Sequence, residues 1–135
     1  MNEKKTGSFY TPEAVVQFMI RFLHSQGQSF QRVLEPAAGD GRFLTALPLD
    51  RIHVDAVELF EDKVCDMSSR ITAQSLHYFS VDFLDYVNTC RERYDLIIGN
   101  PPYVSLKNMD EEEVEKGRHL FETEKIDKSV MQNLW

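Results

Sequence analysis

The stretch from Asp95 to Tyr103 carries the clearest chemistry in this 135-residue chain, because an apolar run of strand type ends there at Asn100, Pro101, Pro102 and Tyr103. Neither proline has a donor N–H and each restricts φ, so the backbone must leave the sheet at Asn100 and hold that amide rigidly. The Asn100 side-chain oxygen and the Pro101 carbonyl are two fixed acceptors for the two protons of an amino group, whose lone pair is then directed at an electrophile. Tyr103 offers a ring on which a nucleobase turned out of its duplex can stack. A rigid aromatic turn without chemistry is the alternative.

A second feature is the small-residue loop from Ala37 to Gly41. It follows a short strand predicted over residues 31–35 and precedes a helix predicted over residues 42–47. The arrangement is only partly that of a dinucleotide-binding loop, because Leu44 stands where the third glycine would be.

Acidic residues decide which ligand this loop favours. Glu35 and Asp40 place two carboxylates around it, which penalises a diphosphate and favours a ligand with an ammonium or sulfonium group. Glu58 follows Gly41 by 17 residues, at the end of the second predicted strand, where an acid binds a ribose diol. A ribosylated, cationic, phosphate-free ligand describes S-adenosylmethionine better than NAD. For Glu35, an ordinary strand-end carboxylate is the alternative.

The elements that must position these residues begin with an N-terminal helix. Thr11 is predicted as its N-cap, with Pro12 at the first helical position and Glu13 in the first turn. Apolar residues recur at helical spacing, namely Val15, Val16, Met19, Ile20, Phe22 and Leu23, and Gln26-Gly27 ends the pattern. On composition alone, Phe9 and Tyr10 are a hydrophobic lead-in to this helix.

Strand and helix patterns then alternate. Strands are predicted over residues 31–35, 52–57, 76–81 and 94–99, with a helix over residues 60–71 and a polar link before the last strand. This order predicts an α/β fold with a parallel sheet covered on both faces. The chain divides into an N-terminal cap and helix (1–30), an α/β core (31–104) and a charged, helical segment without a further strand (105–135).

Composition limits the partners. The net charge is −7, from 15 basic and 22 acidic side chains, whereas a stand-alone nucleic-acid-binding protein shows a basic patch. No apolar run has the ~20 residues of a membrane span and no signal peptide is recognisable, so a cytoplasmic location is expected. Cys65, Cys90 and the four histidines lack ligand spacing, and we expect no metal site.

These motifs together resemble the class I S-adenosylmethionine-dependent methyltransferases. More closely, the chain is similar to the N-terminal part of the DNA adenine (amino-group) methyltransferases of restriction–modification systems, which have a Rossmann-like fold. The matching motifs are Gly7-Ser8-Phe9-Tyr10-Thr11-Pro12, Val33 to Gly41, Glu58, Asp82-Phe83 and Asn100-Pro101-Pro102-Tyr103.

The resemblance implies roles for particular residues. The catalytic set is Asn100, Pro101, Pro102 and Tyr103. The first motif would close over the methionine end of the cofactor, Glu58 would bind its ribose, and Asp82 and Phe83 would flank its adenine. The full set expected to bind S-adenosylmethionine is Phe9, Tyr10, Thr11, Glu35, Pro36, Ala37, Gly39, Gly41, Glu58, Leu59, Asp82 and Phe83.

The family fold has more strands than the four predicted here and carries a target-recognition domain. We therefore expect the chain to be truncated after the fourth strand and to contact double-stranded DNA through a recognition domain outside it. It is expected to associate with the remaining part of the enzyme or with itself. Two alternatives remain: methylation of a protein glutamine or an RNA base, and a non-catalytic cofactor-binding fragment.

Overall fold

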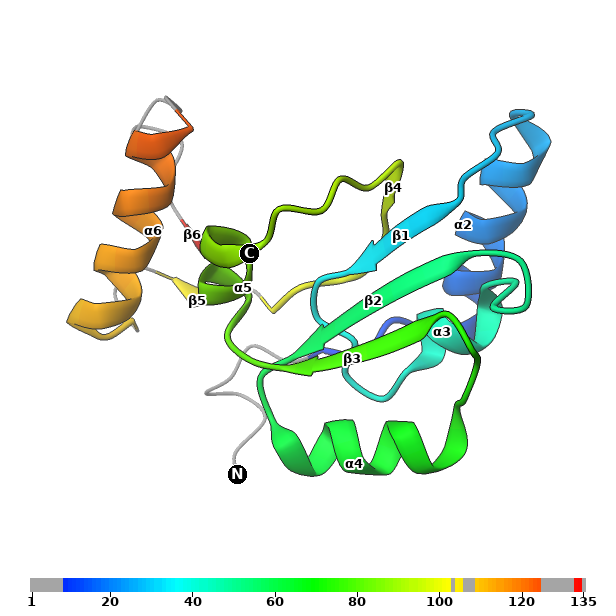
Figure 1. The fold of residues 1–135 in the computed structure, drawn as a ribbon, viewed down its shortest axis with the longest axis horizontal. Helices are drawn as coiled ribbons and strands as arrows, with labels where there is room; N and C mark the ends of the chain where they lie inside the picture. The colour runs from blue at the N-terminus through cyan, green and yellow to red at the C-terminus, as the bar shows by residue number, and fades with distance from the viewer. Residues whose placement is uncertain (1–8, 103, 106–108, 125–132, 135) are drawn as a thin grey trace.

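The computed structural model describes residues 9–102, 104–105, 109–124 and 133–134. Its centre is a parallel four-stranded sheet with the strand order β3-β2-β1-β4 (Figure 1). The strands are β1 (Arg32–Glu35), β2 (His53–Glu58), β3 (Leu76–Ser80) and β4 (Leu96–Ile97). Because all four are parallel, their carboxyl ends lie at one edge of the sheet, as the sequence predicts.

One face of the sheet is covered by α2 (Glu13–Ser25), α3 (Arg42–Ala46) and α4 (Glu61–Arg70). Val33 and Val54 point to this side from neighbouring strands and pack in one core with Val16, Ile20 and Met67 of the helices. Each such side chain contributes about 1.5–3 kcal/mol when it is fully buried. This core fixes the helices that carry the site.

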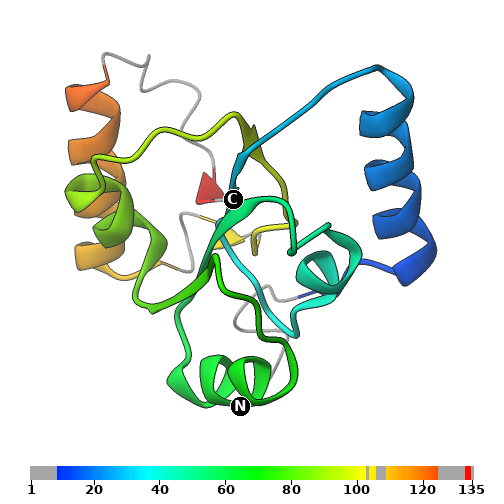
Figure 2. The same ribbon diagram turned by 45° about the vertical axis from the view of Figure 1, so that its right-hand side comes forward.

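The opposite face carries α5 (Phe83–Thr89), against which α6 (Glu111–Thr123) packs (Figure 2). Leu34 and Val57 point to this side and cluster with Tyr86 of α5. An ion pair of 2.8 Å between Lys116 Nζ and Asp85 Oδ2 joins the two helices. The prediction of a parallel sheet covered on both faces is therefore confirmed.

The predicted start of the first helix is wrong by one residue. Pro12 is the N-cap, since its carbonyl accepts the N–H groups of Val15 (2.9 Å) and Val16 (3.2 Å). The Thr11 side chain caps nothing, and its buried hydroxyl has no hydrogen-bond partner among the described residues. Thr11 is thus left available to the site.

Helix α5 is not among the predicted elements, because only a polar link is predicted between the end of the third strand and the fourth. Asp82 begins the helix by accepting hydrogen bonds from the backbone N–H groups of Leu84 (2.8 Å) and Asp85 (3.3 Å). The helix has only seven residues, which is too short for a clear periodic pattern.

The C-terminal segment contains the predicted helix, α6, which begins with a capping box between Asp110 and Glu113. The prediction that no strand follows the fourth is wrong. Val104–Ser105 (β5) pairs antiparallel with Asn133–Leu134 (β6). Two residues on each side leave no period for a sequence pattern to show. Among the described residues, no helix combines the length and apolar character that spanning a membrane requires.

Candidate active site

The carboxyl edge of the sheet brings together the ends of the strands and the loop after β1. Glu35 and Glu58 end β1 and β2, Asp82 follows β3, and Asn100 follows β4. Residues separated by 65 positions in the chain thus share one edge because the sheet is parallel. The carboxyl edge is where open α/β sheets bind ligands.

The loop between β1 and α3 depends on its glycines. Gly39 and Gly41 have φ of 60° and 83°, values that residues with a side chain rarely adopt. The loop also packs closely on the C-terminal end of α4, because a Cβ at Gly41 would lie 2.6 Å from Cδ1 of Ile71, the C-cap, and 3.3 Å from Met67 Cγ. Ala38 donates its N–H to the Val57 carbonyl (2.9 Å), so the loop is fastened to the end of β2.

Glu58 is part of the same fastening. One carboxylate oxygen accepts the N–H of Gly39 (2.9 Å), the other accepts that of Phe60 (3.1 Å), and the residue is 6% exposed. Each oxygen retains a further lone pair for a hydroxyl donor. Leu59, the next residue, is exposed. The predicted ribose acid therefore also sets the position of the glycine loop, which the sequence did not indicate.

Glu35 is a carboxyl group without access to solvent. It is 0% exposed, Oε1 accepts the Ala37 N–H (3.3 Å), and Oε2 has no hydrogen-bond partner among the described residues. Burial, with a smaller contribution from the negative charge of Glu58, raises its pKa to about 8. Gly99 faces it so closely that a Cβ there would lie 2.2 Å from Oε1. At neutral pH Glu35 is mainly uncharged, and a cationic ligand would favour its ionised form.

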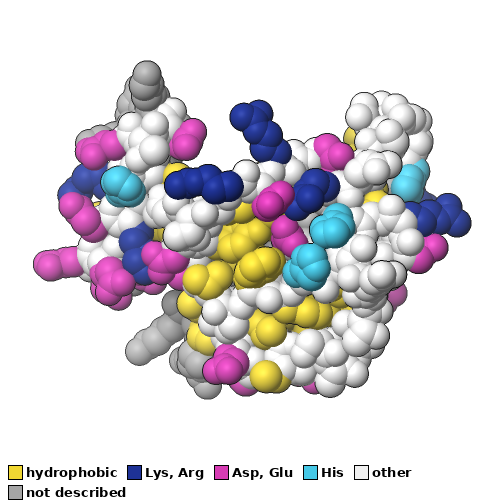
Figure 3. All heavy atoms as spheres, viewed as in Figure 1, with side chains coloured by type: hydrophobic (Ala, Val, Ile, Leu, Met, Phe, Trp, Pro, Cys, Tyr) yellow, Lys and Arg dark blue, Asp and Glu magenta, His cyan; other side chains and the backbone are white. Residues whose placement is uncertain are grey.

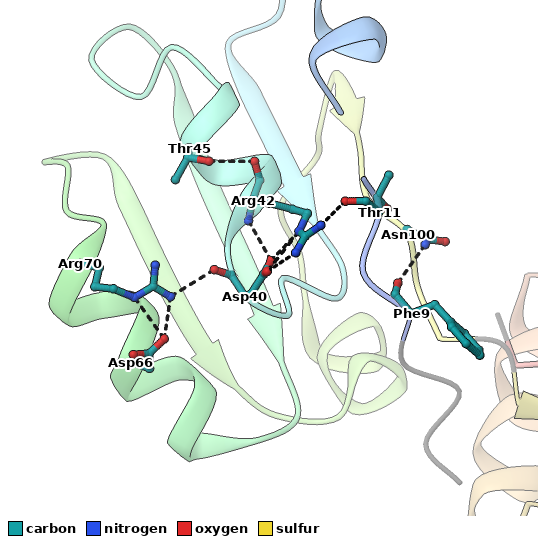
Figure 4. A network of polar contacts seen from close by, with 8 residues as sticks. All are labelled: Phe9, Thr11, Asp40, Arg42, Thr45, Asp66, Arg70 and Asn100. Atoms are coloured by element: carbon teal, nitrogen blue, oxygen red, sulfur yellow. Dashed lines mark hydrogen bonds and ion pairs between the residues drawn. The ribbon is translucent and has the colours of Figure 1, made fainter. Parts of the chain in front are cut away.

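The N-terminal segment Phe9–Thr11 lies against the glycine loop. The Tyr10 ring contacts Gly39, since a Cβ there would be 3.2 Å from Tyr10 Cε1. Asn100 Nδ2 donates to the Phe9 carbonyl (3.2 Å) (Figure 4). The Phe9 side chain is 71% exposed, so the backbone of this segment, more than the Phe9 ring, joins it to the end of β4.

Arg42 is a site residue that sequence reasoning missed. Its Nε donates to both carboxylate oxygens of Asp40 (3.0 and 3.1 Å), and its Nη1 donates to the Thr11 carbonyl (Figure 4). The guanidinium carbon also lies 5.1 Å from the centre of the Tyr10 ring. Hydrogen bonds from Arg42 hold the pKa of Asp40 below its usual value. The sequence feature that could have indicated this role is the acid Asp40, which precedes Arg42 by two residues at the glycine loop.

The remaining predicted residues divide into three groups. Pro36 is buried and Ala37 half-buried beside Glu35, and Pro101 and Pro102 are half-buried after Asn100. Asp82 caps the N-terminus of α5, and Phe83 packs against the hydrophobic cluster that contains Leu34. That these two residues flank the adenine ring of the cofactor stays a prediction. Tyr103 lies outside the described residues. Within the described ranges, no three His, Cys, Asp or Glu side chains are arranged to hold a metal ion.

Comparisons with known proteins agree on one class of protein. The family model described as "Eco57I restriction-modification methylase" matches residues 50–132, and the model "N-6 DNA Methylase" matches residues 1–57. The Type II methyltransferase M.HincII of Haemophilus influenzae is 31% identical over 115 residues, which cover 82% of this chain and 20% of that protein. The modification methylase CviBIII of Paramecium bursaria Chlorella virus NC1A is 28% identical, over 98% of this chain and 36% of that one.

Not all similar proteins are named for DNA. A tRNA1(Val) (adenine(37)-N6)-methyltransferase of Erwinia tasmaniensis is 33% identical over 57% of this chain and 34% of its own length. Among solved structures, a Pyrococcus horikoshii protein described as an RNA methyltransferase superposes with a TM-score of 0.61 at 20% identity, over 76% of this chain and 52% of that one. This likeness shows the Rossmann-like methyltransferase fold. The chain spans about a fifth to a third of the length of these curated relatives.

Proposed function

The chain belongs to the Eco57I restriction-modification methylase family, and on that premise we propose that it binds S-adenosylmethionine and supplies the transfer site of a DNA adenine methyltransferase. The acceptor is the exocyclic amino group of an adenine turned out of its duplex. The observation that carries the proposal is that Asn100 and the buried acid Glu35 lie at the same edge of the sheet. Gly99 joins the two, because it precedes Asn100 and contacts the Glu35 carboxyl.

The residues present fit this cofactor. Two buried polar atoms without partners among the described residues, Thr11 Oγ1 and Glu35 Oε2, belong to residues predicted to bind it. Polar atoms buried in this way cost free energy unless a partner arrives. The Thr11 hydroxyl can donate a hydrogen bond to a carboxylate of the ligand, and the Glu35 carboxyl can interact with an ammonium or sulfonium group. The fit therefore favours an amino-acid ligand with positive charge.

When bound, S-adenosylmethionine supplies a methyl group on a positively charged sulfur. Glu58 has lone pairs left for ribose hydroxyls while it holds the Gly39 N–H. Tyr10, which lies against Gly39, covers the loop and limits the access of water. Glu35 is the group that ionises to balance the positive charge of the ligand.

Asn100 and Pro101 act on the acceptor. The Asn100 donor end is engaged by the Phe9 carbonyl, so Oδ1 is the end that accepts from an amino group. Together with the Pro101 carbonyl it would accept both amino protons and direct the lone pair toward the methyl group. Catalysis then depends on position and on preorganised dipoles, without a strong general base.

DNA is the favoured acceptor because both matching family models describe DNA or restriction–modification methylases. The surface does not add to this: on the face in Figure 3, basic side chains are scattered among acidic ones, and the net charge is −7. Phosphate contacts would therefore come from parts of the enzyme outside this chain. Such a partner part, or self-association, also fits β4, whose Ile97 is 62% exposed at the edge of the described sheet. The proposal includes a cytoplasmic location, which suits a methyltransferase of a restriction–modification system.

The test is transfer of labelled methyl groups from S-adenosylmethionine to unmethylated DNA, to unmodified tRNA and to a release-factor protein, each with wild-type chain and Asn100→Ala. We expect label on adenine of DNA, abolished by the substitution, with cofactor affinity within a few-fold. Label only on tRNA, or only on glutamine of the release factor, would show that the acceptor is RNA or protein and not DNA. No transfer to any acceptor, with cofactor binding intact, would favour a non-catalytic cofactor-binding part.

A further inference from the structure

The Phe9–Thr11 segment is held at both of its ends. At Thr11, the backbone carbonyl accepts a hydrogen bond from Arg42 Nη1, and at Phe9 the carbonyl accepts one from Asn100 Nδ2 (3.2 Å). Between them the Tyr10 ring lies against Gly39 and beside the Arg42 guanidinium. Figure 4 shows that Arg42 and Asn100 both contact the Phe9–Thr11 segment, Arg42 from the start of α3 and Asn100 from the end of β4.

Arg42 is itself fixed in place. Both carboxylate oxygens of Asp40 accept hydrogen bonds from Arg42 Nε, and one of them also accepts a hydrogen bond from Nη2 at 2.5 Å. This geometry leaves Nη1 to donate to the Thr11 carbonyl. The Asp40 backbone carbonyl accepts from Arg70 Nη2 (3.2 Å), which ties the loop to α4. A guanidinium has donors for the acid and the carbonyl at once, whereas a lysine ammonium is a single point of charge.

We propose that Arg42 is a positioning residue for methyl transfer: held by Asp40, it fixes the Phe9–Thr11 segment and thereby sets which end of the Asn100 amide faces the acceptor. The proposal rests on the proposed function, because that function assigns the acceptor to Asn100. In this role Arg42 acts through the Phe9–Thr11 segment, whose Phe9 carbonyl holds the Asn100 amide.

The physical reason lies in the near-symmetry of an amide. The two ends of Asn100 have almost the same shape, and rotation about χ2 is broad and roughly two-fold. Only a fixed acceptor such as the Phe9 carbonyl distinguishes the donor end. If the segment moves away, Nδ2 can turn toward the acceptor, where it would face the N–H groups of an amino substrate and repel them. The Thr11 hydroxyl, on the same segment, would lose its position as well.

The orientation of Asn100 is measurable without any ligand. In ¹⁵N-labelled chain the side-chain NH₂ signal of Asn100 is identified by its loss in Asn100→Ala, and its exchange with water is compared between variants. We expect Arg42→Ala to speed this exchange by about tenfold or more, as loss of a well-fixed hydrogen bond implies. Arg42→Lys should give a partial effect, and Asp40→Asn an effect in the same direction. S-adenosylmethionine affinity should fall in the same order.

Arg70→Ala is the matched control, because it removes an arginine that contacts Asp40 but not the Phe9–Thr11 segment. It should change the Asn100 signal much less than Arg42→Ala does, because the Asp40 carboxylate still holds Arg42. All measurements are made well below the melting temperature of each variant, and Asp40→Asn replaces Arg42→Ala if the latter does not fold.

An unchanged Asn100 signal in Arg42→Ala, or an equal change in Arg70→Ala, would overturn the proposal. The amide readout requires no cofactor, so it remains decisive even if the wild-type chain fails to bind S-adenosylmethionine, a result that would contradict the proposed function. Cofactor binding by wild type together with an unchanged amide in Arg42→Ala would overturn the positioning role alone.

Discussion

Replacing the buried carboxyl of Glu35 by an amide should make the protein more stable at neutral pH and a poorer binder of its ligand. The folded-state pKa is about 8, against 4.5 for the exposed group. Between these values the unfolded chain releases the proton while the folded protein keeps it, so stability falls as the pH rises. Below pH 4.5 both states are protonated, and above pH 8 both are ionised, so the dependence is confined to that window.

The magnitude follows from the linkage. Because the pKa of Glu35 is raised in the folded protein, stability falls by about 2–3 kcal/mol between pH 5 and pH 7. Glu35→Gln removes this titration and keeps the shape of the side chain. The difference in unfolding free energy, variant minus wild type, should therefore increase by about 2–3 kcal/mol over that range.

Urea unfolding at pH 5, 6, 7 and 8 measures this difference, in which all other titrating groups cancel. Glu61→Gln, which replaces an exposed carboxyl at the start of α4, is the control with which the change for Glu35→Gln is compared. A flat difference for Glu35→Gln would refute the reasoning. In the same variant, affinity for S-adenosylmethionine should fall by about ten- to a hundredfold, the effect of losing a charge-assisted hydrogen bond.

Three further substitutions test the packing and the polar contacts. Gly99→Ala places a Cβ 2.2 Å from Glu35 Oε1 and should destabilise by about 1–3 kcal/mol in thermal or urea unfolding; a fully additive loss in Gly99→Ala/Glu35→Ala would contradict a clash between the two. Tyr94→Phe removes the hydroxyl that donates to the buried Asp55 carboxylate (2.6 Å), so unfolding free energy should drop by about 1–3 kcal/mol, and an unchanged value would show that water replaces it. Glu58→Ala should weaken S-adenosylmethionine binding by about 1.5–3 kcal/mol in calorimetry, whereas an unchanged dissociation constant would place the ribose elsewhere.

The sequence was sufficient for the sheet and for its functional edge. Strand-type runs that end at Glu35, Glu58 and Asn100 predict where those side chains meet, because parallel strands share one carboxyl edge. It was insufficient where a contact depends on tertiary position. The bond from Arg42 to Thr11 joins positions 31 residues apart, and no local pattern encodes it.

Two other features show the same limit. Gly99 lies directly on the fully buried Glu35, a contact between the end of β1 and the residues after β4 that neither segment indicates by itself. Asp55 and Tyr94 form a hydrogen bond between segments 39 residues apart, which the strand pattern around Asp55 does not indicate. The N-cap was assigned to Thr11 because threonine is a good capping residue, but its hydroxyl makes no capping hydrogen bond here.

The most direct test of the central claim is calorimetric titration of the chain with S-adenosylmethionine and with its demethylated product, with NADH as the control. The edge at Glu35 and Glu58 predicts saturable one-to-one binding of S-adenosylmethionine and its product, no binding of NADH, and weaker binding in Glu35→Gln. Binding of NADH in preference, or S-adenosylmethionine binding that Glu35→Gln leaves unchanged, would contradict the account.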